Sequence, residues 1–359
     1  MFRKQYYPKS IQGDELDLYL EEGWYRSGQV LFTTHLIILE NDVYTPVWTR
    51  LPLENYSFKK RLRKLFNKNN KRFKIVFDKA FIDEEKEALY TQHKVRFGKY
   101  PPQTLRQYLL DCSKDSVFNS HEVRVYDGEE LIAVSFFDIG NNSMMSILAL
   151  YNQSYQKESL GIYTMLLEID FAQKKGLKYH YSGYVVPKYE RFDYKLRVGN
   201  LEFYNMFERT WESYENLDIY GLPAEKMKEK LSVVISYFDM LQLPYGTFVY
   251  RLYDTSVVRS KSMNFLDNPL FINCLQIELK SPSLIVEYDL LKEKYLLSWC
   301  RELRLQQARY YMVKEKVVLE TANVTKLLQT IWQVQQQLKQ VANKICLLYT
   351  SDAADEWLR

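Results

Sequence analysis

Residues 121–186 constrain the fold of this chain more than any other stretch. Between residues 121 and 151 the sequence alternates apolar and polar side chains, which is typical of strands in a sheet. The pair Asp127-Gly128 is a strong hairpin signal, and a second turn follows at Gly140. The pattern therefore predicts three consecutive strands, of which the first two form a hairpin.

A helix and a fourth strand are expected after these three strands. Residues 159–176 form an amphipathic pattern that includes Ile162, Leu166 and Ile169, and Gly176 stands where a helix C-cap belongs. Residues 177–186 alternate tyrosine with other side chains and favour a strand. This order of elements predicts an α+β fold with a mixed sheet.

Composition excludes several broad classes of protein. The chain has 359 residues, which suggests two or three domains, and 47% hydrophobic with 26% charged residues argues against disorder. The four cysteines form no CxxC pair, which excludes the usual zinc-finger spacings and a disulfide framework and suits a reducing compartment. We find no signal-peptide pattern, and the longest mainly apolar stretch, residues 231–243, is too short and polar to span a bilayer. We therefore expect a cytoplasmic protein without membrane segments, whose oligomeric state the sequence leaves open.

The end of the chain has an unusual sequence. Residues 346–359 read CLLYTSDAADEWLR, and most of this run resembles a sequencing adapter translated in frame. The expectation is that the natural chain stops near Lys344 and that Cys346 is not native. The alternative is a short polar tail.

Residues 57–74 carry the strongest charge signal. This stretch contains nine basic residues and no acidic residue, although the formal net charge of the whole chain is only +4. Leu62, Leu65 and Phe66 are spaced as one face of a helix, so the first half is predicted to be a helix with an apolar seam and a cationic face. Such faces are usually just solvated, but nine uncompensated cations favour binding to a phosphate backbone.

The C-terminal third contains no motif that indicates a function. Residues 225–300 mix short apolar runs with turns. Residues 300–345 are rich in Gln, Leu and Val, with Leu328, Ile331 and Leu338 near one face, and predict a long bundle-like helix.

Common catalytic motifs are missing from the sequence. There is no GxSxG, Walker A, HExxH or GxGxxG pattern. The histidines, at positions 35, 93, 121 and 180, are isolated, and each is expected to be a surface or satisfied core residue rather than a metal ligand.

Residues 159–195 contain a specific motif. It combines S-L-G-x-Y, L-x-E-I, G-L-x-Y-x-Y-x-G-Y and Y-K, and its fixed positions are Ser159, Leu160, Gly161, Tyr163, Leu166, Glu168, Ile169, Ala172, Gly176, Leu177, Tyr179, Tyr181, Gly183, Tyr184, Tyr194 and Lys195. This motif closely resembles the C-terminal domain of the arginyl-tRNA–protein transferases and their bacterial leucyl-transferring relatives. The strand-helix-strand core likewise resembles the GNAT acyltransferase fold.

Segments upstream extend the resemblance to about residues 15–210. Asp138 stands at the family's acidic position, GWYRSG (23–28) resembles its G-W-R-R-x-G, and residues 50–69 resemble its basic segment. The family's cysteine clusters are missing from residues 33–46 and 187–195. A metal or iron–sulfur cluster is therefore not expected.

The resemblance implies a fold and an activity. The implied fold is a GNAT-like acyltransferase core, with a mixed, split sheet flanked by helices, followed by a C-terminal helical extension. The implied activity is transfer of arginine, or leucine, from charged tRNA to the N-terminal α-amine of acceptor proteins in an N-degron pathway. Aminoacyl-tRNA is then the co-substrate and no other cofactor is expected. Because its ester is already activated, the enzyme must only position the amine, remove a proton and stabilise the oxyanion.

The resemblance also suggests site residues. The predicted catalytic residues are Asp138, Tyr184, Tyr194 and Lys195. The predicted substrate-binding residues are Arg26, Ser159, Gly161, Tyr163 and Tyr181. The predicted tRNA-binding residues are Lys59, Lys60, Arg61, Arg63, Lys64, Lys68, Lys71 and Arg72.

Asp138 has two interpretations. It shares one face of a predicted strand with Val134 and Phe136, so a buried carboxylate there needs a cationic partner. That partner is either a cationic group of a substrate or a structural residue such as Lys195 or Arg197. Glu168 is expected to be a structural partner of a basic residue.

The predicted domains are residues 1–110, an N-terminal region with the basic tRNA-binding segment; 111–215, the aminoacyltransferase core; 216–345, an extension of unknown role; and 346–359, the adapter-like tail. Two other functions stay open. One is an N-acetyltransferase using acetyl-CoA, although residues 156–163 supply only Gly161 of the expected pyrophosphate loop. The other is an inactive adaptor that binds RNA or degrons.

Overall fold

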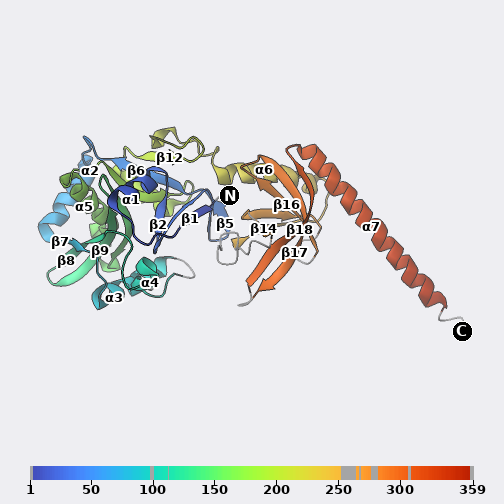
Figure 1. Ribbon diagram of the computed structural model, residues 1–359, viewed down its shortest axis with the longest axis horizontal. Helices are drawn as coiled ribbons and strands as arrows, with labels where there is room; N and C mark the ends of the chain where they lie inside the picture. Colours follow the sequence, from blue (N-terminus) through green and yellow to red (C-terminus); the bar gives the residue numbers. More distant parts are fainter. Residues whose placement is uncertain are drawn as a thin grey trace. The chain divides into compact units, whose positions relative to one another are not determined.

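The computed structural model describes residues 3–97, 101–111, 113–251, 264–266, 268–275, 282–305 and 309–355. The chain divides into two compact units (Figure 1). The first comprises Phe2–Glu40 and Thr45–Ile219, and the second comprises Asn41–Tyr44 and the chain from Tyr220 onwards.

An eight-stranded sheet forms the centre of the first unit. Its strands, in spatial order, are β13 (Thr210–Ser213), β12 (Glu202–Asn205), β6 (Val47–Pro52), β11 (Tyr179–Val185), β10 (Ser143–Tyr151), β9 (Glu130–Ile139), β8 (Ser120–Asp127) and β7 (Lys74–Lys79). Strands β10 and β11 are parallel, and the other neighbours are antiparallel. Strands β6 and β7, from the first 110 residues, thus belong to the same sheet as β8–β11.

Helices and a small sheet complete this unit. The helices are α1 (Gly13–Glu21), α2 (Lys60–Arg72), α3 (Glu84–His93), α4 (Leu105–Leu110) and α5 (Leu160–Lys174), with the 3-10 helices η1 (Lys94–Phe97), η2 (Gln153–Glu158), η3 (Glu190–Val198) and η4 (Tyr214–Asn216). The small sheet has the order β1 (Arg3–Tyr6), β3 (Val30–Thr34), β2 (Tyr25–Ser27), and β4 (Ile37–Leu39) follows it in the chain.

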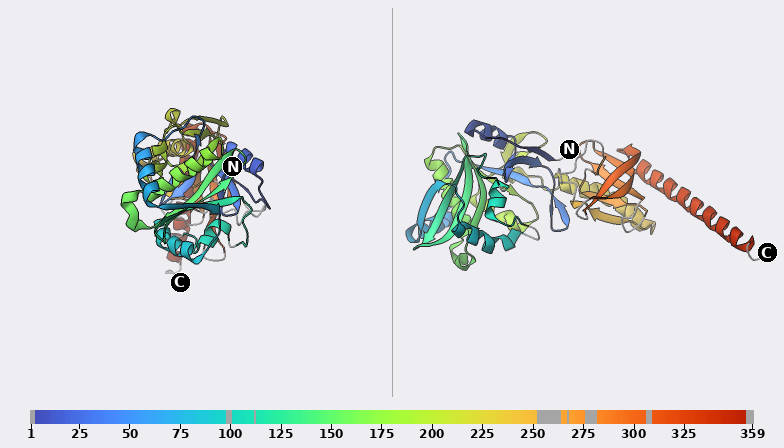
Figure 2. Two further views of the ribbon diagram at one scale, coloured as in Figure 1. Left: turned by 90° about the vertical axis from the view of Figure 1, so that its left-hand side faces the viewer. Right: turned by 60° about the horizontal axis from the view of Figure 1, so that its bottom comes forward.

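Alternation along β9 assigns its two faces to different helices. Ala133 and Phe137 pack with α5 in one core cluster, which also contains Leu62 of α2. Val134 and Phe136 pack in another cluster with residues of α3 and α4. Burial of both faces explains why the helices lie on both sides of the central sheet (Figure 2).

The predicted α+β core with a mixed, split sheet flanked by helices is confirmed. The strands β8, β9 and β10 precede α5, which begins at Leu160. Strand β11 follows α5 and is the parallel neighbour of β10. The predicted basic helix is also present, and it continues beyond the expected first half of 57–74 as far as Arg72.

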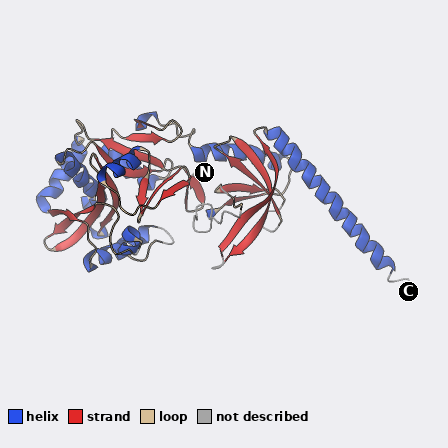
Figure 3. Cartoon of the chain, viewed as in Figure 1, coloured by secondary structure: helices blue, strands red, loops and turns tan. Residues whose placement is uncertain are grey.

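The second unit contains a five-stranded antiparallel sheet with two helices (Figure 3). Its elements are β5 (Asp42–Tyr44), α6 (Pro223–Met240), β14 (Gly246–Val249), β15 (Leu270–Asn273), β16 (Ser283–Asp289), β17 (Lys294–Leu305), β18 (Arg309–Thr321) and α7 (Val324–Asp355).

The prediction of a helix over residues 300–345 is wrong for its first half. Lys294–Leu305 and Arg309–Thr321 form two long antiparallel strands, and the helix begins only at Val324. Glu, Leu, Arg and Gln favour helices by local propensity, but cross-strand pairing with β16 and burial of Leu297 and Cys300 override this preference. The extension is therefore not purely helical.

Candidate functional site

The central sheet splits between β10 and β11. These strands pair only over three residue pairs, from Ser143↔Tyr179 to Met145↔Tyr181, and then diverge although both continue. Each strand has a bulge just beyond this point, β10 between Ser146 and Leu148 and β11 between Tyr181 and Gly183. Backbone groups that face the split have no partner on the opposite strand, so they must bond to side chains, water or a ligand.

The hydroxyl of Tyr25 lies at the apex of the split. Its Oη is 2.5 Å from the carbonyl oxygen of Ser146 on β10 and 3.0 Å from that of Tyr181 on β11. The ring stacks on Trp48, with centroids 5.4 Å apart, so β2 holds the hydroxyl in place. A phenol has one proton and donates to one of these carbonyls at a time.

Lys195 extends from η3 to the same place. Its Nζ donates to the carbonyl oxygen of Tyr184 at 3.0 Å and lies beside Gly183. A Cβ built on Gly183 would be 3.1 Å from Lys195 Nζ and 3.2 Å from Tyr25 Oη. The absence of a side chain at Gly183 therefore lets the amine and the phenol approach β11.

A buried polar network lies beneath the split. Glu168 of α5 accepts a hydrogen bond from Ser135 Oγ at 2.5 Å, and its other oxygen is 3.0 Å from Nε2 of His180. Glu168 and His180 side chains are 0% and 1% exposed. The expectations that Glu168 has a structural partner with a basic side chain and that His180 is a satisfied core residue are confirmed.

Burial shifts the proton affinities of the groups at the split. It lowers the pKa of Lys195 from 10.5 to about 8, against an opposing effect of the Glu168 carboxylate. Burial also raises the pKa of Tyr184 to about 12 and that of Tyr25 well above its ordinary value. At neutral pH both phenols are therefore proton donors, whereas the amine titrates within reach of physiological pH.

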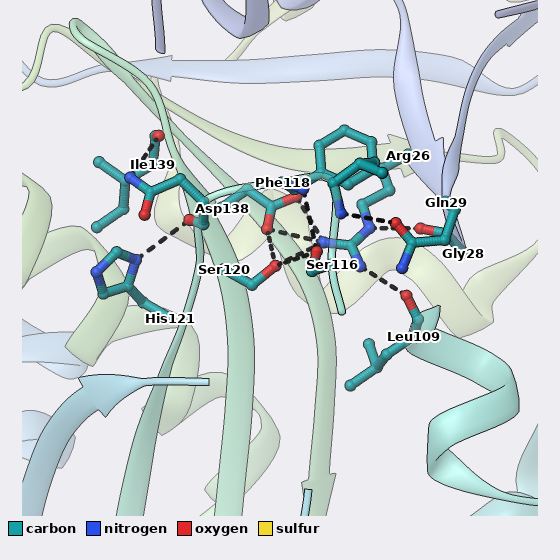
Figure 4. Close-up of polar contacts among 12 residues, drawn as sticks. Arg26, Gly28, Gln29, Leu109, Ser116, Phe118, Ser120, His121, Asp138 and Ile139 are labelled. Carbon is teal, nitrogen blue, oxygen red and sulfur yellow. Dashed lines mark hydrogen bonds and ion pairs between the residues drawn. The ribbon is translucent and has the colours of Figure 1, made fainter. Parts of the chain in front are cut away.

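Asp138 and Arg26 form a buried ion pair (Figure 4). By alternation along β9, Asp138 lies on the same face as Val134 and Phe136, which is the face away from α5. Arg26 Nη1 lies 2.8 Å from both carboxylate oxygens, and Ser120 Oγ donates to the same carboxylate at 2.6 Å. The guanidinium also donates to the carbonyl oxygens of Gly28 and Leu109. The expected cationic partner of Asp138 is present, but it is Arg26 rather than Lys195, Arg197 or a substrate group.

A model of a known protein family matches the part of the chain that contains β11 and η3. The family model described as "Arginine-tRNA-protein transferase, C terminus" matches residues 85–205, which contain β8–β11, α5 and η3. This part of the chain therefore matches the transferase family. The resemblance drawn from the motif over 159–195 is thereby confirmed.

Two curated relatives, both named as leucyltransferases, match a longer part of the chain than the family model does. The aspartate/glutamate leucyltransferase of Leptospira interrogans serogroup Icterohaemorrhagiae serovar copenhageni (strain Fiocruz L1-130) is 26% identical over 194 residues, which are 53% of this chain and 74% of that protein. The aspartate/glutamate leucyltransferase of Campylobacter jejuni (strain RM1221) is 27% identical over 216 residues, 58% of this chain and 84% of that protein.

Solved structures give weaker matches. L-PGS from Bacillus licheniformis aligns with 50% of this chain and 52% of its own, at 11% identity and a TM-score of 0.29. A GCN5-related N-acetyltransferase from Kribbella flavida aligns with 42% of this chain and 50% of its own, at 11% identity and a TM-score of 0.24.

Several family motif residues are structural in this protein. Tyr163 is fully buried and donates to Asn70 of α2, so its prediction as a substrate contact is corrected. The side chain of Tyr181 is also buried, with its ring 5.6 Å from that of Trp211, and only its backbone carbonyl faces the split. The predictions that Arg26 binds substrate and that Asp138 is catalytic are also corrected, because the two side chains form a buried ion pair with each other.

The other predicted residues lie at two places. Tyr184 and Lys195 meet at the split, and Tyr194 is close enough to affect the proton affinity of Tyr25. Ser159, with a φ of 50°, and Gly161 form the start of α5, where a Cβ on Gly161 would meet the ring of Tyr151.

Tyr25 and Gly183 were not singled out as site residues from the sequence. Gly183 was only a motif position, and Tyr25 stands where the resembling G-W-R-R-x-G pattern has its first arginine. The tyrosine in place of this arginine is the feature of the sequence that could have pointed to Tyr25.

The basic helix α2 lies beside α5 (Figure 1). Asn69 donates to the carbonyl oxygen of Glu158 at 2.8 Å, which fixes α2 next to the start of α5. The basic side chains of residues 57–74 are exposed. Arg72 pairs with Asp127 and Glu158, but in the described part of the chain no acid forms a salt bridge with the other eight.

The described residues contain neither a cluster of metal-ligating side chains nor a helix that could cross a membrane. No group of three or more His, Cys, Asp or Glu side chains there is placed to hold a metal ion. No helix among the same residues has both the length and the apolarity needed to cross a membrane.

Proposed function

We propose that this protein transfers an amino acid from aminoacyl-tRNA to the N-terminal α-amine of acceptor proteins. Two relatives at 26% and 27% identity are named as leucyltransferases, and residues 85–205 match the transferase family. The observation that carries the proposal is that Gly183, Tyr184 and Lys195 of the family motif meet at the split.

The chemistry of the split suits this reaction. An aminoacyl ester is already activated, so no nucleophilic side chain is needed, and the site has to orient an amine, take its proton and stabilise the oxyanion. The phenol of Tyr25 is a fixed hydrogen-bond donor beside unpaired strand backbone. Trp48, which packs between Tyr25 and Tyr184, has an indole Nε1 without a hydrogen-bond partner in the described structure.

Leucine fits this site better than arginine as the donor amino acid. An arginyl side chain needs a carboxylate that is not already paired. Asp138 is neutralised by Arg26, and Glu168 is engaged by Ser135 and His180. The rings of Tyr25, Trp48 and Tyr184 pack in a row next to the split, and such apolar surroundings suit an apolar donor.

The relatives are named for aspartate and glutamate, and we propose that the acceptors of this protein begin with one of these residues. Such modification fits an N-degron pathway, and because charged tRNA is the co-substrate we propose that the reaction takes place in the cytoplasm. We also propose that the reaction uses no metal or cofactor besides aminoacyl-tRNA.

Single-turnover transfer tests the proposed function. Labelled leucyl-tRNA or arginyl-tRNA is mixed with excess protein and a peptide that begins with Asp or Glu, and the labelled peptide is quantified. We expect label from leucyl-tRNA, and none when the peptide N-terminus is acetylated. Folded protein that binds tRNA but labels no peptide from either donor would contradict the proposal and favour the adaptor interpretation.

Cations on α2 are expected to contact the tRNA backbone. Changing Lys59, Lys60, Arg63 and Lys64 to Gln should weaken tRNA binding and lower the slope of log K against log salt by up to about one unit per lost phosphate contact. Binding is measured by fluorescence anisotropy over a salt series.

A matched variant controls for net charge. Changing Lys226, Lys230, Lys292 and Lys294 to Gln removes the same number of cations from the second unit and leaves α2 of the first unit unchanged. It should leave the salt slope unchanged, and equal slopes for the α2 variant and the wild type would contradict tRNA binding by α2.

A further inference from the structure

We propose that Lys195 is the group that takes the proton from the attacking α-amine of the acceptor. This inference rests on the proposed function and assigns a chemical role inside it. Lys195 is partly buried on η3, and its Nζ reaches the point where β10 and β11 diverge.

The amine of Lys195 is held in place by a hydrogen bond, and no carboxylate in the described residues neutralises its charge. Lys195 Nζ donates one hydrogen bond, to the backbone carbonyl oxygen of Tyr184, and no carboxylate in the described residues forms a salt bridge with it. The carboxylate that acts electrostatically on Lys195 is that of Glu168, which forms hydrogen bonds with Ser135 and His180. A buried amine that is hydrogen-bonded but unpaired loses its proton more easily than an exposed one.

Other groups at the split are less suited to accept a proton. The phenols of Tyr25 and Tyr184 have raised pKa values and stay protonated at neutral pH. Asp138 is paired with Arg26, and His180 is 1% exposed and directed at Glu168. Among the described side chains, those with an electrostatic effect on Tyr25 of β2, Tyr184 of β11 or Lys195 of η3 are Tyr108 of α4, Asp138 of β9, Glu168 of α5, and Arg191 and Tyr194 of η3. His180 of β11 and Arg26 of β2 in turn contact Glu168 and Asp138.

The step balances without a further reactant. The lone pair of the neutral acceptor α-amine attacks the ester carbonyl carbon, and neutral Lys195 Nζ takes one proton from the attacking nitrogen. The new C–N bond forms, the negative charge collects on the carbonyl oxygen, and the bond from that carbon to the ribose oxygen then breaks. The ribose oxygen leaves with the electron pair and takes the proton from the lysine ammonium, while the amide nitrogen keeps its one remaining proton.

Two Lys195 variants test this role in single-turnover transfer to an acidic peptide. Lys195→Arg keeps a cation, but a guanidinium has a pKa far above that of the lysine amine and stays protonated, so the rate should fall by about 10²-fold or more. Lys195→Ala should show a similar loss, and added ethylamine should restore labelling of the peptide at least tenfold. Only the peptide product is counted, because ethylamine itself also accepts the amino acid.

The pH profile separates a proton acceptor from a merely structural lysine. In the wild type the rate should rise with pH through about 8, as Lys195 becomes neutral. The Glu168 carboxylate favours protonated Lys195, so Glu168→Gln should move this rise to lower pH. The α-amine of the peptide also titrates near this pH, but its contribution is the same for both proteins.

Glu122→Gln is the matched control. It replaces another fully buried carboxylate of the same unit, which pairs with Lys86 and Arg124 rather than facing the split. This variant should keep the wild-type profile even if it is less stable. Full activity of Lys195→Arg, or a Glu168→Gln profile identical to the wild type together with no rescue by ethylamine, would overturn the role of Lys195. If the wild type itself transfers no amino acid, the proposed function fails first.

Discussion

Asp138→Asn is expected to lower the free energy of unfolding by about 3–5 kcal/mol, because it leaves the buried guanidinium of Arg26 without its counter-charge. Side chains of both residues are 1% exposed or less, and Arg26 also ties β2 to the carbonyl oxygens of Gly28 and Leu109. Transfer per folded molecule should stay close to the wild type, because neither charge is open to substrate. Chemical denaturation and single-turnover transfer on the same sample measure both quantities.

A double-mutant cycle shows whether the loss belongs to the pair. Arg26→Gln should cost a similar amount, and Arg26→Gln with Asp138→Asn should cost clearly less than the sum. Arg209→Gln is the control, because Arg209 pairs with Glu22 at the surface, where both side chains are more than half exposed, and its loss should cost at most about 1 kcal/mol. An Asp138→Asn protein with normal stability and strongly reduced transfer would show that Asp138 acts on a substrate.

The sequence predicted the central sheet well because its signals are local. Alternation in 121–151, the Asp127-Gly128 turn and the amphipathic pattern of 159–176 each depend on neighbouring residues, and each corresponds to an observed element. β17 and β18 were missed because pairing between distant segments decides their conformation. Charge and helix-favouring residues in 300–321 gave the opposite local signal.

The site was predicted less well, because its residues are chosen by spatial contact. The sequence indicated that Asp138 needs a cation, but the partner, Arg26, lies 112 positions away and could not be selected by spacing. Tyr163 and Tyr181 belong to the family motif, yet the structure shows that their side chains support the core. Motif membership alone therefore does not separate residues that contact substrate from those that hold the fold.

Tyr25 shows the opposite case, a residue at the site that the sequence did not single out. It comes from β2, in a different sheet from β10 and β11, and only the folded chain brings its hydroxyl to the split. The departure from the family's arginine at this position was visible in the sequence. Its meaning depends on the geometry, because the phenol bridges toward two carbonyl oxygens of diverging strands.

Gly183→Ala is expected to reduce single-turnover transfer by about 10²-fold, since a displacement near 1 Å at a reacting group has an effect of this size. The new methyl group would be 3.1 Å from Lys195 Nζ and 3.2 Å from Tyr25 Oη, closer than such atoms normally approach. The amine is the more flexible of the two and should be displaced. The backbone φ of 89° is also unfavourable for alanine and should cost about 1–3 kcal/mol of stability.

Two other glycines separate backbone strain from the effect on the site. Gly128 and Gly176 have φ values of 64° and 72°, and no atom lies within 4 Å of a Cβ built on either. Gly128→Ala and Gly176→Ala should therefore lose stability through strain but keep the wild-type rate per folded molecule. If the site interpretation is right, adding Gly183→Ala to Lys195→Ala should slow transfer little further, because both changes remove the same positioned amine. Additive losses, or a fully active Gly183→Ala protein, would show that the space beside Gly183 does not position Lys195.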